Sequence, residues 1–253
     1  TVQKFALRTL ADRKEHIAKV PLKPFLEGLT SSSDEVKAIS LIGLGRLGKK
    51  EVASELLKVN VPNSFVAPKI NTEGPHATPN SEIILPHLAA KALVEINAVD
   101  ECIAALGTAQ ADMALWAMRS MHSDKVVEAL IKAYDSKKII DGLVEGNQNV
   151  DNDFKHKIIN NLARIYYKEQ PYDASWWWST RPDTHGPYYK TMEWNQSPVI
   201  RSFLVNQFEN SGKDAASPFA ELNSKYRLGI DVFGEVKKEK PKEDMPVVDF
   251  EKI

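Results

Sequence analysis

The 253-residue sequence has a single cysteine and no long apolar run, and both absences limit what the chain can be. Cys102 has no second thiol to pair with, so an intramolecular disulfide and a cysteine-based metal cluster are both excluded. It falls in an apolar helical run, Cys102–Leu106, where we expect a small buried hydrophobe rather than a reactive thiol. No apolar run reaches the roughly 18–20 residues of a membrane span, so we expect no membrane insertion.

The sequence also lacks an excess of charge of either sign. Lys and Arg number 33 against 34 Asp and Glu, for a formal net charge of −1. Neither a nucleic-acid partner nor an anionic membrane surface is therefore indicated. The first residues, TVQKFALRTL, begin with a helical pattern and not with a charged-then-apolar signal segment. We expect a mature form or a fragment of a longer protein.

Motifs that specify a reaction or a metal are missing as well. No nucleophile elbow, phosphate loop or zincin spacing occurs, and the six histidines are scattered. Gly43–Gly48 matches G-x-G-x-x-G, yet it lies within and at the end of a predicted helix rather than after a strand, so a dinucleotide site is not indicated. We therefore expect no enzyme activity, no metal and no cofactor. The alternative is an acid–base or metal site where two long insertions meet. Its members would be Glu73, His76, Asp183 and His185.

What the sequence does contain is helical periodicity that returns in pairs of helices. The clearest first helix is Ser33–Leu47, which Ser33 or Asp34 can cap, and a shorter helix follows at Glu51–Val59. The same pairing returns three times along the chain: Pro86–Ile96 with Asp100–Leu106, Ala111–Met121 with Asp124–Tyr134, and a helix from Asp153 with Pro198–Phe208. The unit is about 25 residues long once Asn60–Leu85 is set aside.

Helix pairs of this size cannot bury their apolar faces alone, so we expect neighbouring pairs to stack into a curved solenoid. The predicted fold class is all-α, with helical repeats over residues 1–234 and non-helical insertions at 60–85 and 171–198. Met113, Trp116 and Met121 are predicted core residues. No segment shows the alternation typical of strands. Residues 235–253 contain the charged run KKEKPKED, which predicts a linker or tail there.

The insertion Pro171–Pro198 concentrates the aromatic residues, with four of the five tryptophans and three of the seven tyrosines. Ordered connections longer than roughly 12–15 residues are usually functional, and Trp, Tyr and Arg dominate binding hot spots. We therefore predict that ligand or partner binding occurs in this insertion. The predicted binding residues are Trp176, Trp177, Trp178, Arg181, Asp183, His185, Tyr188, Tyr189 and Trp194.

Three interpretations of this insertion stay open. It can fold back as a structural cap that supplies core through Trp177 and Tyr188, since large aromatics bury about 150–250 Å² each. It can form a docking surface for a protein partner. It can also offer a saccharide platform, in which Trp176 or Trp194 stacks on an apolar ring face while Arg181 and Asp183 bind hydroxyl groups.

Three parts of the sequence resemble known protein regions. The pattern D-x-V-x-A…L-G-x-L-G resembles HEAT-like repeats, and it consists of Asp34, Val36, Ala38, Leu44, Gly45, Leu47 and Gly48. Trp177–Lys190, WWSTRPDTHGPYYK, resembles the HEAT-like region of large secreted bacterial proteins that also carry a sugar-dehydrogenase-like propeller and a c-type haem domain. The tail from Asp231, DVFGEVKKEKPKED, is similar to the linker that leads into that haem domain.

This resemblance implies a HEAT-like fold, an extracytoplasmic setting (periplasmic or secreted) and a non-catalytic scaffold or protein-interaction module. It links the module to electron transfer or carbohydrate oxidation. The expected partner is a c-type haem domain or propeller of the same larger protein. The alternative is a saccharide- or small-ligand-binding module that uses the loop 171–198. The chain has no C-x-x-C-H, so any covalently attached haem of the larger protein lies outside these residues.

Overall fold

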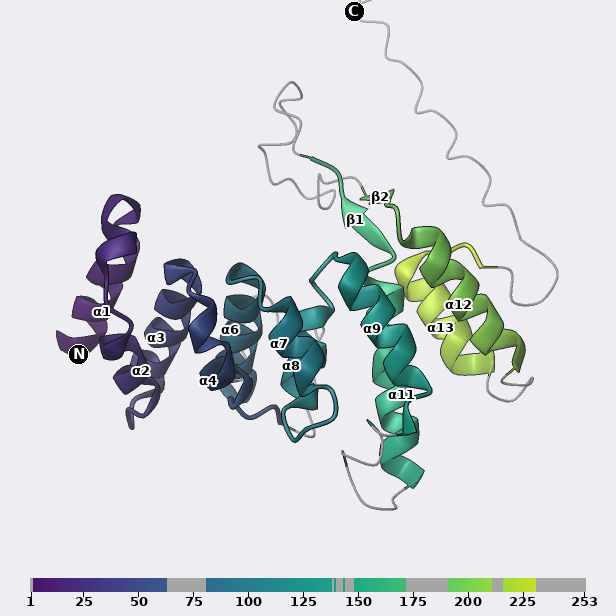
Figure 1. The fold of residues 1–253 in the computed structure, drawn as a ribbon, viewed down its shortest axis with the longest axis horizontal. Coiled ribbons are helices and arrows are strands. Elements are labelled where there is room, and N and C mark those ends of the chain that lie inside the picture. The colour runs from purple at the N-terminus through teal and green to yellow at the C-terminus, as the bar shows by residue number, and fades with distance from the viewer. Residues whose placement is uncertain are drawn as a thin grey trace, which may run out of the picture. The chain divides into compact units, whose positions relative to one another are not determined.

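Helices dominate the part of the chain that the structure, a computed structural model, describes (Figure 1). These residues are 2–62, 81–137, 139, 143, 148–171, 191–210 and 216–230. The all-α class is confirmed for them. Within these ranges no helix combines the length and the apolar character needed to cross a membrane. The chain divides into two compact units, Thr1–Ile200 and Arg201–Ile253.

The helices of the first unit form two series along the chain. The first series consists of α1 (Val2–Asp12), α3 (Asp34–Leu47), α6 (Ser81–Glu95), α8 (Ala111–Met118) and α11 (Gln148–Arg164). The second series consists of α2 (Lys23–Leu29), α4 (Ala53–Leu57), α7 (Val99–Ala105) and α9 (Asp124–Tyr134). Short 3-10 helices, η1 (Lys14–Lys19) and η2 (Lys50–Val52), precede α2 and α4.

Contacts join each helix to its neighbours in this order. In the first series α1 packs on α3, α3 on α6, α6 on α8, and α8 on α11. In the second series α4 packs on α7 and α7 on α9. Each second helix also packs on the first helix that follows it: α2 on α3, α4 on α6, α7 on α8, and α9 on α11. The apolar faces are therefore buried between successive helices.

The last residue of each of the first three predicted first helices is in the core. Leu47, Ile96 and Met121 are 8%, 3% and 5% exposed. After Leu47 the chain turns at Gly48, whose φ of 66° is a left-handed conformation that favours glycine at a helix C-terminus. Asp124 opens α9, where a carboxylate interacts favourably with the helix dipole.

The start of α6 differs from the predicted start at Pro86. The helix begins at Ser81, so residues 81–85 of the insertion predicted at 60–85 are helical and Pro86 lies inside the helix. A proline there removes one backbone hydrogen bond, to the carbonyl of Glu82. Packing of α6 on α3, α4 and α8 offsets that cost.

The expectation of no strands is wrong at one place. Two three-residue strands, β1 (Tyr167–Glu169) and β2 (Thr191–Glu193), pair antiparallel, with Lys168 opposite Met192. Three residues are too few to show the alternation that identifies a strand in a sequence. The predicted insertion at 171–198 therefore begins and ends close to a short ladder.

The second unit contains most of α12 (Ser197–Asn210), which was predicted at 198–208, and α13 (Ala216–Tyr226). The rings of Phe208 and Phe219 meet edge to face, with centroids 5.4 Å apart. Arg201 donates hydrogen bonds of 3.0 and 2.9 Å to the carbonyls of Leu228 and Gly229. The predicted tail at 235–253 lies outside the described residues.

Cys102 is fully buried in α7, and the structure makes its reactivity predictable. Burial raises the pKa of the thiol to about 12, and the charge of Glu101 adds to the rise. The thiolate is the nucleophile, so the folded protein should hold almost none of it near neutral pH. We expect a disulfide reagent such as DTNB to leave the folded chain unmodified and to label one thiol after denaturation in guanidinium. Rapid labelling of the folded chain would contradict this burial.

Candidate functional site

Among the residues predicted to bind, Trp194 is the one that the structure describes. The others lie outside the described residues: Trp176, Trp177, Trp178, Arg181, Asp183, His185, Tyr188 and Tyr189. Glu73 and His76, of the alternative acid–base site, lie outside them too. Their roles stay predictions.

Trp194 fixes the C-terminal end of the aromatic insertion to the first unit. Its indole Nε1 donates a 2.8 Å hydrogen bond to the carbonyl of Ile165. Its backbone N–H donates to Ser197 Oγ at 2.9 Å. Its ring meets His122 edge to face, with centroids 5.4 Å apart. The indole N–H is therefore used within the protein.

Further contacts hold the two ends of the insertion together. Ser197 is fully buried, and its Oγ donates to the carbonyl of Tyr166 at 2.5 Å. The hydroxyl of Tyr166, itself 1% exposed, donates to Glu193 at 2.7 Å. The exposed His122 ring lies 2.8 Å from the carbonyl of Tyr167 through Nε2. Nothing in the sequence near His122 signals a contact with a residue 45 positions away.

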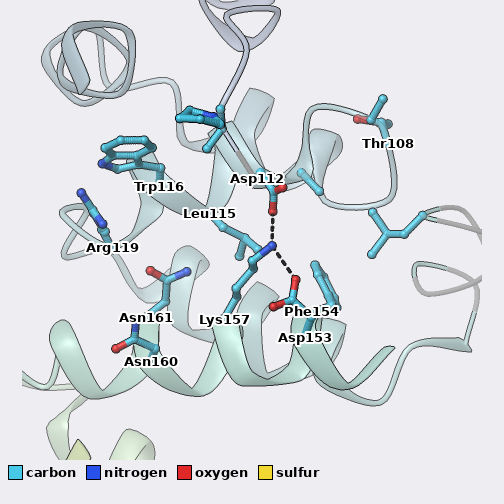
Figure 2. Close-up of a pocket in the computed structure, with 15 residues that line it drawn as sticks. Thr108, Asp112, Leu115, Trp116, Arg119, Asp153, Phe154, Lys157, Asn160 and Asn161 are labelled. Atoms are coloured by element: carbon cyan, nitrogen blue, oxygen red, sulfur yellow. Dashed lines mark hydrogen bonds and ion pairs between the residues drawn. The ribbon is translucent and has the colours of Figure 1, made fainter. Parts of the chain in front are cut away.

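A pocket of about 740 Å³ lies between α8 and α11 (Figure 2), and none of its described lining residues belongs to 171–198. Two stripes of side chains at helical spacing line it, one on each helix. The stripe on α8 is Asp112, Leu115 and Trp116, continued by Arg119 at the helix C-cap, and the stripe on α11 is Asp153, Phe154, Lys157, Asn160 and Asn161. Thr108, Ala109, Ala111, Val61, Pro62 and Leu143 complete the lining.

Lys157 joins the two stripes at the centre of the pocket. Its Nζ lies 2.7 Å from Asp112 Oδ1 on α8 and 2.6 Å from Asp153 Oδ2 on its own helix, as the dashed lines in Figure 2 show. Burial by itself lowers the pKa of Lys157, but hydrogen bonds to the two carboxylates and their charges outweigh it and raise the pKa above its usual value. Lys157 is therefore cationic at physiological pH.

Trp116 was predicted to be core together with Met113 and Met121. The two methionines are buried, at 1% and 5% exposure. Trp116 is only half-buried and lines the pocket, with the Arg119 guanidinium 4.7 Å from its ring centroid. Trp116 lies three positions after Met113, so its direction differs from that of Met113 by about 60° around the helix axis. This difference is enough to bring a large ring from the core to its edge.

Asn161 is one of the polar residues of this pocket that sequence reasoning missed. It is 5% exposed, and its side-chain amide has no hydrogen-bond partner among the described residues. Figure 2 shows the amide directed away from α11, on the side of Arg119 and Trp116. An amide that forms no hydrogen bond with a described residue keeps its donors and its acceptor for a bound molecule.

The chemistry that the pocket offers is hydrogen bonding, charge pairing and contact with an aromatic ring. Over the described ranges, no three His, Cys, Asp or Glu residues are placed to hold a metal ion. No family model matches the sequence of this chain, and no curated protein matches it either.

Proposed function

We propose that this chain is a HEAT-like helical repeat module that serves as a non-catalytic scaffold in an extracytoplasmic multidomain protein. The observation that carries this proposal is the order of helix contacts from α1 to α11. Each first helix packs on the next first helix, each second helix packs on the first helix that follows it, and α4, α7 and α9 also pack in succession. Contacts of this kind, between neighbours in chain order, are what a solenoid of stacked helix pairs requires.

The docking-surface interpretation of the aromatic insertion fits this scaffold. The ends of the insertion are held by the β1–β2 ladder and by the hydrogen bonds of Ser197 and Trp194. A fixed base reduces the entropy that a loop loses on binding. The resemblance of Trp177–Lys190 then suggests the partner: a c-type haem domain or a propeller of the same larger protein. Through that partner the module would serve electron transfer or carbohydrate oxidation.

Calorimetric titration tests this proposal. The chain should bind either an isolated c-type haem domain or an isolated propeller from a protein that carries the segment WWSTRPDTHGPYYK. Trp177→Ala should weaken binding by about tenfold or more, because truncation of a hot-spot tryptophan typically costs about 2 kcal/mol or more. Phe5→Ala is the matched control, since Phe5 is an aromatic residue of α1 that is 59% exposed.

Two results would count against the scaffold role. One is that neither domain binds the chain. The other is that Trp177→Ala and Phe5→Ala weaken binding equally, because the aromatic insertion would then have no special part in docking.

A further inference from the structure

The pocket between α8 and α11 has the size of a small-ligand site. Its volume of about 740 Å³ falls within the range of roughly 300–1,000 Å³ that such sites occupy. The stripe on α11 runs from Asp153 to Asn161. It is about 12 Å long, because each of its eight residue steps rises about 1.5 Å along the helix. Polar side chains face this space from both helices, so a ligand would meet hydrogen-bonding groups on two sides.

Asn161 sets the first requirement for a ligand. Its amide carries donors and an acceptor, and in the described part of the chain it makes no hydrogen bond. A matching ligand must therefore accept and donate at the same place. A pair of hydroxyl groups does so, because each hydroxyl is at once a donor and an acceptor.

The charges of the pocket set the second requirement. Two carboxylates, Asp112 and Asp153, stand against two cations, Lys157 and Arg119, so the charges of the described lining residues sum to zero. Asp112 Oδ2 and Asp153 Oδ1 accept no hydrogen bond from any described residue, since Lys157 binds the other oxygen of each carboxylate. These oxygens would repel an anion and accept hydrogen bonds from hydroxyl groups. The cations disfavour a positively charged ligand in the same way.

Trp116 supplies the third element, an aromatic ring that is half-buried at the pocket wall. Ligand pockets combine such apolar surface with a few convergent polar groups. A sugar ring has an apolar face of C–H groups and a rim of hydroxyls, and it therefore matches both. An extended peptide fits less well, because its backbone polar groups lie along its length and not around a rim.

We propose that this pocket binds a short neutral saccharide, with Asn161, Asp112 and Asp153 hydrogen-bonded to its hydroxyl groups and Trp116 against its apolar face. None of the described residues that line the pocket belongs to the insertion 171–198, and the proposal does not depend on the scaffold function. Haem-domain or propeller binding can fail while saccharide binding succeeds, and the reverse holds as well.

The test is a titration of the whole chain with a panel of neutral sugars: cellobiose, maltose and methyl β-glucoside. The readouts are the Asn161 side-chain amide signal in ¹H–¹⁵N spectra, tryptophan fluorescence and calorimetry, at sugar concentrations up to about 10 mM. Blocked trialanine (acetylated and amidated) serves as the peptide probe. We expect at least one sugar to shift the Asn161 signal and the peptide to leave it in place.

Two variants and one control tie binding to the pocket. Asn161→Leu keeps the side-chain shape but removes the donor and the acceptor, and it should weaken sugar binding by about tenfold. Its free energy of unfolding should change little, because the amide forms no hydrogen bond with a described residue that the variant would break. Trp116→Phe should weaken binding and abolish the fluorescence response. His156→Ala should bind as the wild type does, since His156 is exposed on α11 and does not line the pocket.

Three outcomes would overturn the proposal. In the first, no sugar of the panel moves the Asn161 signal. In the second, a sugar binds but Asn161→Leu and Trp116→Phe leave its affinity unchanged, which places the contact elsewhere. In the third, blocked trialanine shifts the Asn161 signal and the sugars do not, which makes the pocket a peptide site.

Discussion

Replacing Gly43 with alanine should lower the free energy of unfolding of the first unit by about 2 kcal/mol. A Cβ atom at Gly43 would overlap the ring of Phe25, whose Cζ would lie 3.2 Å away. That ring is fully buried in α2, and α2 packs on α3, so the aromatic side chain has no free space to move into. The overlap outweighs the gain of about 1 kcal/mol that alanine brings to a helix. Urea unfolding followed by far-UV circular dichroism measures the difference.

Gly107→Ala is the matched control for this substitution. The three atoms nearest to a Cβ there would all belong to Ile139, the nearest of them 3.6 Å away, which is an ordinary contact. We expect its stability to stay the same or to rise by up to about 1 kcal/mol, because alanine restricts the unfolded chain. Equal stabilities of the two variants would contradict this prediction, because the Phe25 ring would then move aside for the added Cβ atom at little cost.

The helix pairs could be predicted because their signal is local and repeated. Apolar residues at helical spacing locate α3, α7, α8 and α9 to within a few residues, and the buried ends at Leu47, Ile96 and Met121 follow from the same periodicity. The boundary of α6 was missed because Pro86 is a start signal in sequence terms. Packing on three other helices extends the helix beyond it.

The α8–α11 pocket could not be predicted because it depends on which polar residues face one another across two helices. Asp112 and Lys157 are 45 positions apart, and each occurs in the sequence as an ordinary charged residue of a helix. Asn161 has no local feature that distinguishes it from Asn160, yet it is 5% exposed and Asn160 is exposed. Burial of one asparagine and not of its neighbour follows from the angle at which α11 meets α8 and α9, and periodicity alone does not fix that angle.

Replacing Ser197 with alanine should destabilise the first unit by about 2–3 kcal/mol, because one hydroxyl serves two backbone groups there. Ser197 Oγ donates to the carbonyl of Tyr166 at 2.5 Å and accepts from the N–H of Trp194 at 2.9 Å. Alanine would leave both groups without this partner at a site where the serine is fully buried. Amide exchange at Lys168 and Met192, which pair across β1 and β2, should become faster than in the wild type.

Ser123→Ala provides the control for this variant. Ser123 precedes α9 as Ser197 stands at the start of α12, but its side chain makes no capping hydrogen bond, so its loss should change stability by less than about 0.5 kcal/mol. If Ser197→Ala were equally mild, the two hydrogen bonds would not hold the ends of the insertion together.

If Ser197→Ala loosens β1 and β2 as expected, the docking proposal makes a further prediction. Partner affinity should then fall in Ser197→Ala although every aromatic residue of the insertion is intact, because the base that orders the loop is lost.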